Sequence, residues 1–152
     1  MRQINRIIVH CSATREGQNV TVNDIKKWHM RDNKWRDIGY HYVIHLDGSI
    51  HLGRPESEIG AHVANHNKDS IGICYVGGVD LKNKAKDTRT AAQKRSLEVL
   101  IRSLLIKYPK ATIHGHREFA AKDCPSFDVA EYKYLEKQSA VQKFLGIFRG
   151  RK

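Results

Sequence analysis

Residues 70–76 read Ser70-Ile71-Gly72-Ile73-Cys74-Tyr75-Val76, a stretch apolar enough to form a central strand of a sheet. An earlier run, Ile7-Ile8-Val9, predicts a second buried strand. Between the two, residues 40–46 and 49–52 flank Asp47-Gly48, a dipeptide that favours a hairpin turn. The sequence therefore predicts two buried strands and one hairpin.

Helices are predicted on either side of these strands. Thr21, followed three positions later by Asp24, has the pattern of a capping box and predicts a helix to about Arg31. Thr90 and Gln93 repeat that pattern before a longer helix. Its apolar residues recur at helical spacing, namely Leu97, Leu100, Ile101, Leu104, Leu105 and Tyr108, until Pro109 ends it.

A short strand over residues 111–114 and a helix after Pro125, running through Val129, Tyr132 and Leu135, complete the prediction. Strands mixed with helices of this size indicate an α/β fold with a central mixed β-sheet flanked by helices. At 152 residues, without internal repeats or a linker, the chain fits one domain, predicted over 1–137, and a distinct tail over 138–152.

The composition limits the classes of partner. A formal charge of +11 and a pI near 9.7 favour a negatively charged partner, such as nucleic acid, an acidic cell wall or an anionic membrane. No aromatic and basic residues interleave as in a nucleic-acid-binding motif, so nucleic acid is not expected. Three cysteines, with no C-x-x-C pair, argue against a disulfide framework. The N-terminal residues contain no apolar segment typical of an export signal.

Candidate metal ligands fall at two places in the sequence. His10 ends a predicted strand, where side chains emerge toward a ligand cleft. His116 and Cys124, eight positions apart across a turn, could converge with it on one metal ion and leave an open position for water, as in catalytic zinc sites. His114 stays an alternative ligand, since it lies two residues from His116. Cys11 should point to the opposite face of the strand from His10.

The sequence resembles the zinc amidase family shared by phage lysozymes and peptidoglycan recognition proteins, and in particular the small amidase lysozymes of T-odd podophages. The resemblance runs in order from about Ile7 to Asp128. The motifs that carry it are His10-Cys11-Ser12-Ala13-Thr14, Gly39-Tyr40-His41-Tyr42, Asp47-Gly48, Ser70-Ile71-Gly72-Ile73, Val76-Gly77-Gly78 and Cys124-Pro125-Ser126-Phe127-Asp128.

This resemblance implies roles for individual residues. It makes His10, His116 and Cys124 the ligands of a Zn²⁺ ion, Tyr40 and Lys122 the catalytic side chains, and His62 a residue near the substrate. The implied reaction is hydrolysis of the amide between N-acetylmuramic acid and L-alanine in bacterial peptidoglycan. Cys11 and Cys74 are expected to be buried small apolar residues.

Two other functions remain open at this point. Some members of the family bind peptidoglycan without cutting it, typically after losing the cysteine ligand, which this sequence retains as Cys124. The podophage lysozymes also bind and restrain a phage RNA polymerase, which would be a second function here. The sequence favours a monomeric phage endolysin that stays in the host cytoplasm until lysis and then acts on periplasmic peptidoglycan.

The predicted tail carries basic residues and no acidic residue. Val141, Phe144, Leu145 and Phe148 recur at helical spacing among Lys143, Arg149, Arg151 and Lys152. Two interpretations fit this pattern: a helix packed on the amidase domain, or a basic amphipathic helix that binds an anionic surface such as the outer membrane.

Overall fold

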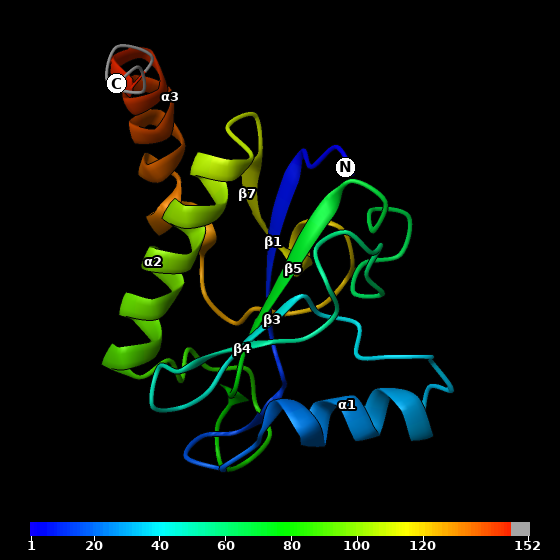
Figure 1. Cartoon of the computed structure of the whole chain (residues 1–152). Coiled ribbons are helices and arrows are strands. Elements are labelled where there is room, and N and C mark those ends of the chain that lie inside the picture. Colours follow the sequence, from blue (N-terminus) through cyan, green and yellow to red (C-terminus); the bar gives the residue numbers. More distant parts are fainter. Residues whose placement is uncertain (147–152) are drawn as a thin grey trace.

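The computed structural model describes residues 1–146 and places three α-helices around a mixed sheet (Figure 1). The strands are β1 (Arg6–Cys11), β2 (Thr14–Arg15), β3 (Tyr42–Ile44), β4 (Ile50–Leu52), β5 (Ser70–Tyr75), β6 (Gly78–Val79) and β7 (Thr112–Gly115). The helices are α1 (Val22–Arg31), α2 (Ala91–Lys107) and α3 (Tyr134–Gly146), with 3₁₀ turns η1 (His116–Glu118) and η2 (Val129–Tyr132).

The main sheet has five strands in the order β4-β3-β5-β1-β7. β1 pairs in parallel with β5 and β7, β3 pairs in parallel with β5, and only the β3–β4 hairpin is antiparallel. β5 and β1 are therefore interior strands, as their apolar sequences predict. The α/β fold with a mixed sheet is confirmed.

Helices cover both faces of this sheet. α2 and α3 lie side by side along one face, and α1 lies across the other (Figure 1). The larger core contains Ile7, Val9 and Cys11 of β1, packed with the buried face of α2. The smaller core contains Ile25 of α1. Alternation along β1 consequently puts His10 on the face opposite Cys11, as predicted.

The two predicted capping boxes are confirmed. Thr21 and Asp24 cap α1 reciprocally, and Thr90 and Gln93 do the same for α2. Buried Gln93 has a second role, since its amide also donates to the carbonyl oxygen of Val76 at 2.9 Å. It thereby joins the start of α2 to the end of the central strand.

The prediction of one continuous helix after Pro125 is wrong, because two separate helical segments follow it. The chain makes the 3₁₀ turn η2 first, capped by the side chain of Asp128, which accepts from the backbone N–H of Ala130, and α3 begins separately at Tyr134. Val129, Tyr132 and Leu135 are all buried, as their spacing predicts, but the first two lie in η2 and Leu135 lies in α3. The short parallel pair β2–β6 was not predicted, because two-residue strands show no periodicity.

α3 crosses the boundary predicted at residue 137. Ser139 is buried and donates to the carbonyl oxygen of Leu105 at 3.1 Å, and Arg102 of α2 donates to Gln138 at 2.6 Å. Val141 is exposed. The predicted tail residues Phe148, Arg149, Arg151 and Lys152 lie outside the described residues. Across residues 1–146, no helix is both long and apolar enough to span a membrane.

Candidate metal and catalytic site

Three of the predicted site residues meet at one end of the central strands. His10, His116 and Cys124 each offer one ligand atom, and these atoms all lie within 4.8 Å of one another. The Nδ1 atom of His10 lies 3.9 Å from Sγ of Cys124. The three residues therefore form a candidate metal site of two imidazoles and one thiol.

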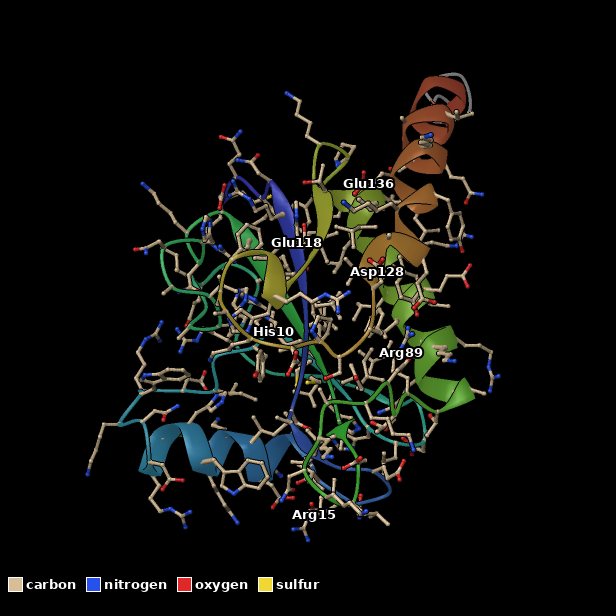
Figure 2. All side chains as sticks on the ribbon, turned by 180° about the vertical axis from the view of Figure 1, so that it is seen from behind. His10, Arg15, Arg89, Glu118, Asp128 and Glu136 are labelled. Atoms are coloured by element: carbon tan, nitrogen blue, oxygen red, sulfur yellow. The ribbon has the colours of Figure 1, made fainter. Side chains whose placement is uncertain are left out.

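The parallel pairing of β1 with β7 brings the two histidines together. Val9 is the register partner of Gly115, so His10, the next residue of β1, and His116, the first residue after β7, lie side by side. Their ring centroids are 4.7 Å apart. Figure 2 shows His10 near the middle of the molecule.

The loop that carries Cys124 is fixed by hydrogen bonds on both sides. The backbone N–H of Arg117 donates to the Cys124 carbonyl at 2.7 Å, and the hydroxyl of Tyr75 donates to the Pro125 carbonyl at 2.6 Å. The backbone N–H of Cys11 donates to Sγ of Cys124 at 3.3 Å. An N–H donor of this kind favours the thiolate, the form in which cysteine binds metals.

A buried arginine supports the same loop from the α2 side. Arg89 lies near the first turn of α2 (Figure 2), and its guanidinium carbon is 3.4 Å from the ring centroid of Phe127. The guanidinium also pairs with Asp87 and Glu131. It therefore links the start of α2 to the segment that follows Cys124.

The alternative ligand, His114, lies elsewhere. His114 is hydrogen-bonded through both ring nitrogens, to Thr112 at 2.7 Å and to Glu118 at 3.0 Å. The Cys11 side chain packs in the larger core, 3.8 Å from the Ser126 hydroxyl. The Cys11 thiol also contacts the thiol of Cys124. Cys74 is fully buried in the smaller core, where it fills space as a small apolar residue.

Burial sets the protonation of the candidate ligands. Desolvation lowers the pKa of His10 well below its ordinary value, and it also lowers that of His116. Both imidazoles are therefore neutral at pH 7 and free to donate a lone pair. The Cys11 thiol and burial together raise the pKa of Cys124, so without a metal ion this thiol keeps its proton.

Tyr40 borders the same site. Its ring centroid lies 5.1 Å from that of His10, and Gly39 beside it has no room for a side chain, because a Cβ there would lie 2.2 Å from the carbonyl oxygen of Ala61. Burial raises the pKa of Tyr40 well above its ordinary value. Its hydroxyl therefore stays protonated and can donate a hydrogen bond.

A pocket of about 410 Å³ opens beside the histidines. Its lining includes Lys122 and His116, together with Trp35, His62, Asn67 and Phe119. Lys122 is exposed and close enough to lower the pKa of both His10 and His116 through its charge. Trp35, Asn67 and Phe119 were not predicted, because no motif or spacing distinguishes them.

His62 lies deeper than its expected position near the substrate suggests. It is buried, and its Nδ1 atom is 2.8 Å from Nε2 of His10. Desolvation lowers the pKa of His62 to about 3, so its ring is neutral. It reaches the pocket lining but also touches a candidate metal ligand directly.

Comparison with known proteins agrees with this arrangement. Residues 1–127 match the family model described as N-acetylmuramoyl-L-alanine amidase. The chain is 46% identical over 126 residues to the endolysin of Escherichia phage T7, covering 83% of each chain. It is also 32% identical to peptidoglycan-recognition protein SC1a of Drosophila melanogaster, over 78% of this chain and 65% of that protein.

Solved structures lead to the same family. The amidase LysC from Clostridium intestinale superposes with a TM-score of 0.76 at 30% identity, covering 88% of this chain and 85% of that one. An endolysin from a Thermus scotoductus bacteriophage superposes with a TM-score of 0.74 at 26% identity, over 90% and 86% of the two chains. The chain belongs to the N-acetylmuramoyl-L-alanine amidase family and is an enzyme of that activity.

Proposed function

We propose that this amidase holds one zinc ion through His10, His116 and Cys124, and that it uses Tyr40 and Lys122 to cut the amide between N-acetylmuramic acid and L-alanine. The observation that carries the proposal is the convergence of the three ligand atoms within 4.8 Å of one another. They come from two parallel strand ends and a loop.

The donor set fits zinc. Two neutral imidazoles and one thiol that becomes a thiolate on binding are ligand types that zinc prefers, and three protein ligands leave one tetrahedral position open, as in catalytic sites. The separation of 3.9 Å between Nδ1 of His10 and Sγ of Cys124 suits two ligands of one small ion, since zinc lies about 2.0 Å from nitrogen and about 2.3 Å from sulfur.

When bound, zinc supplies a Lewis acid that polarises the amide carbonyl and activates water near neutral pH. The side chains around it act on the charges that form. Lys122 and the protonated hydroxyl of Tyr40 would stabilise the negative charge on the carbonyl oxygen, since fixed donors aimed at a developing oxyanion lower the barrier. One of the two would also deliver a proton to the leaving amine of L-alanine.

The pocket beside the site suits a peptide substrate. Among its described lining residues there is no aspartate or glutamate, so the charge of Lys122 makes it electropositive. A stem peptide, which carries free carboxylates, would be attracted there. A binding module that does not cut is disfavoured, because Cys124 is present and lies among the other ligands.

The biological role proposed is that of a phage endolysin. The 46% identity to the endolysin of phage T7 over most of both chains supports this role. Such an enzyme would wait in the host cytoplasm and reach periplasmic peptidoglycan when the inner membrane is breached. Expression in cells with and without a membrane-permeabilising protein tests this location: lysis that depends on permeabilisation supports it, and lysis without permeabilisation contradicts it.

Chelation tests the zinc site. Removal of metal should abolish hydrolysis of purified peptidoglycan, and stoichiometric Zn²⁺ should restore it. Full activity in protein that metal analysis shows to be free of zinc would contradict the proposal.

A second proposal concerns the C-terminal segment, which we propose packs on the domain through its first turns. The buried Ser139 and the hydrogen bond between Arg102 and Gln138 support packing over attachment to a membrane for this part of the helix. A chain ending at Lys137 should lose thermal stability and keep its binding to anionic vesicles. Loss of salt-sensitive vesicle binding at unchanged stability would instead favour a membrane anchor.

A further inference from the structure

A chain of hydrogen bonds runs inward from the metal site through two buried side chains. Nε2 of His10 lies 2.8 Å from Nδ1 of His62, and Nε2 of His62 lies 3.1 Å from the hydroxyl of Ser70. His10 and Ser70 are at most 1% exposed, and His62 is 8% exposed. Both ends of this series are thus shielded from water, and only an edge of His62 reaches the pocket.

The direction of these hydrogen bonds follows from the ligand geometry. Nδ1 is the atom of His10 that faces Cys124, so a metal ion would bind there. A neutral imidazole that binds metal through Nδ1 carries its proton on Nε2, which must then donate to Nδ1 of His62. The proton of neutral His62 is therefore on Nε2 and is donated to Ser70. With one tautomer of each ring, both hydrogen bonds, from His10 to His62 and from His62 to Ser70, have a donor and an acceptor.

The surrounding fold is arranged to hold the His62 ring in this place. Asn67 accepts from the backbone N–H groups of His62 and Val63 at 2.8 and 2.9 Å, which fixes the loop. Gly72 of β5 leaves space for the ring, since a Cβ at that position would lie 2.7 Å from Cγ of His62. The position of the ring is therefore determined by β5 and its own loop, independently of any substrate.

We infer that His62 is a positioning residue for the metal ligand His10: with Ser70, it fixes the tautomer and ring orientation that direct Nδ1 of His10 to the zinc ion. This inference rests on the zinc site proposed above. It differs from the role near the substrate that family resemblance implies for His62. Partners of this kind commonly change metal affinity 10–100-fold when removed.

The test is zinc affinity, measured by competition with a chelator. His62→Leu should weaken zinc binding about 10–100-fold, because Nε2 of His10 loses its acceptor. His62→Asn should recover most of the affinity, since its amide oxygen can accept where Nδ1 did. Ser70→Ala should give a smaller loss. His51→Gln is the matched control, because His51 lies on the edge strand β4 and bonds Ser49, so the change should leave zinc affinity unchanged.

A second readout is the tautomer of His62 in the zinc-bound wild-type protein, measured by ¹⁵N NMR. A proton on Nε2 and a free lone pair on Nδ1 are expected. A proton on Nδ1 overturns the inference even if His62→Leu fails to fold. Wild-type zinc affinity in folded His62→Leu, together with a raised KM for peptidoglycan, also overturns it and makes His62 a substrate contact. If the wild-type protein binds no zinc, the proposed metal site itself fails.

Discussion

Sγ of Cys124 lies 3.9 Å from Nδ1 of His10, although the two residues are 114 positions apart in the chain. Their approach depends on β1, which ends at the site, and on the loop after η1. The Tyr75 hydroxyl and the Arg117 N–H hold this loop in place through hydrogen bonds. The pairing of these two atoms is the structural basis of the proposed zinc site.

Substitution of Cys124 should remove the metal and spare the fold. We expect Cys124→Ser to purify with little zinc and to lose activity, because a serine hydroxyl is not deprotonated as readily as a thiol. Metal analysis of the purified protein checks this. Cys74→Ser, which alters a buried cysteine outside the site, is the control and should retain zinc. Full zinc content in Cys124→Ser would remove this residue from the ligand set.

Loss of either proposed catalytic side chain should reduce turnover while zinc stays bound. Tyr40→Phe and Lys122→Ala each delete one donor to the oxyanion, for which a reduction of about 10²–10³ in kcat is typical. Peptidoglycan binding should change less, because these interactions strengthen in the transition state. Activity assays on zinc-loaded variants provide the measurement. If either variant loses its zinc instead, that residue supports the metal site and has no direct role in the chemistry.

Arg89 should matter for stability more than an exposed ion pair does. Its side chain is 2% exposed, stacks on Phe127 and pairs with two carboxylates. We expect Arg89→Leu to lower the free energy of unfolding by about 3 kcal/mol, near the value for breaking a buried pair. Lys86→Leu, which breaks the exposed pair with Glu16, should cost about 0.5 kcal/mol. Urea titration compares them, and equal losses would mean that Arg89 adds nothing beyond a surface pair.

Buried neutral histidines should make the metal-free protein sensitive to acid. The pKa of His62 falls from its ordinary value of 6.5 to about 3, so the unfolded state binds an additional proton between these pH values. Its stabilising contribution is complete above pH 6.5 and is lost as the pH falls toward 3, at about 1.4 kcal/mol per pH unit for one such group. In the presence of a chelator, the free energy of unfolding between pH 4 and 6 should therefore rise with pH less steeply for His62→Asn than for the wild-type protein. Parallel curves for the two proteins would contradict this.

Much of the fold follows from local patterns in the sequence. The two capping boxes and the Asp47-Gly48 turn predict α1, α2 and the β3–β4 hairpin, because each depends on residues close together in the chain. The division of the last helical region into η2 and α3 was not predicted, since apolar residues at 129, 132 and 135 fit a 3₁₀ turn and an α-helix almost equally well.

The candidate site was partly predictable. Family resemblance identified His10, His116 and Cys124, whereas spacing alone left His114 as an alternative; its bonds to Thr112 and Glu118 are visible only in three dimensions. The contact between His62 and His10 depends on loop packing against Gly72, which no local pattern encodes. Binding to a phage RNA polymerase and to an outer membrane stay predictions.

The central claim is that His10, His116 and Cys124 would hold a zinc ion and that the enzyme, loaded in this way, hydrolyses the amide between N-acetylmuramic acid and L-alanine. Mass spectrometry of purified peptidoglycan digested by the zinc-loaded protein tests it most directly. The account predicts free stem peptides that begin with L-alanine, while the glycan chains keep their length. After chelation, no stem peptides should be released. Fragments in which the stem peptide is still joined to N-acetylmuramic acid, or the same products from zinc-free protein, would contradict it.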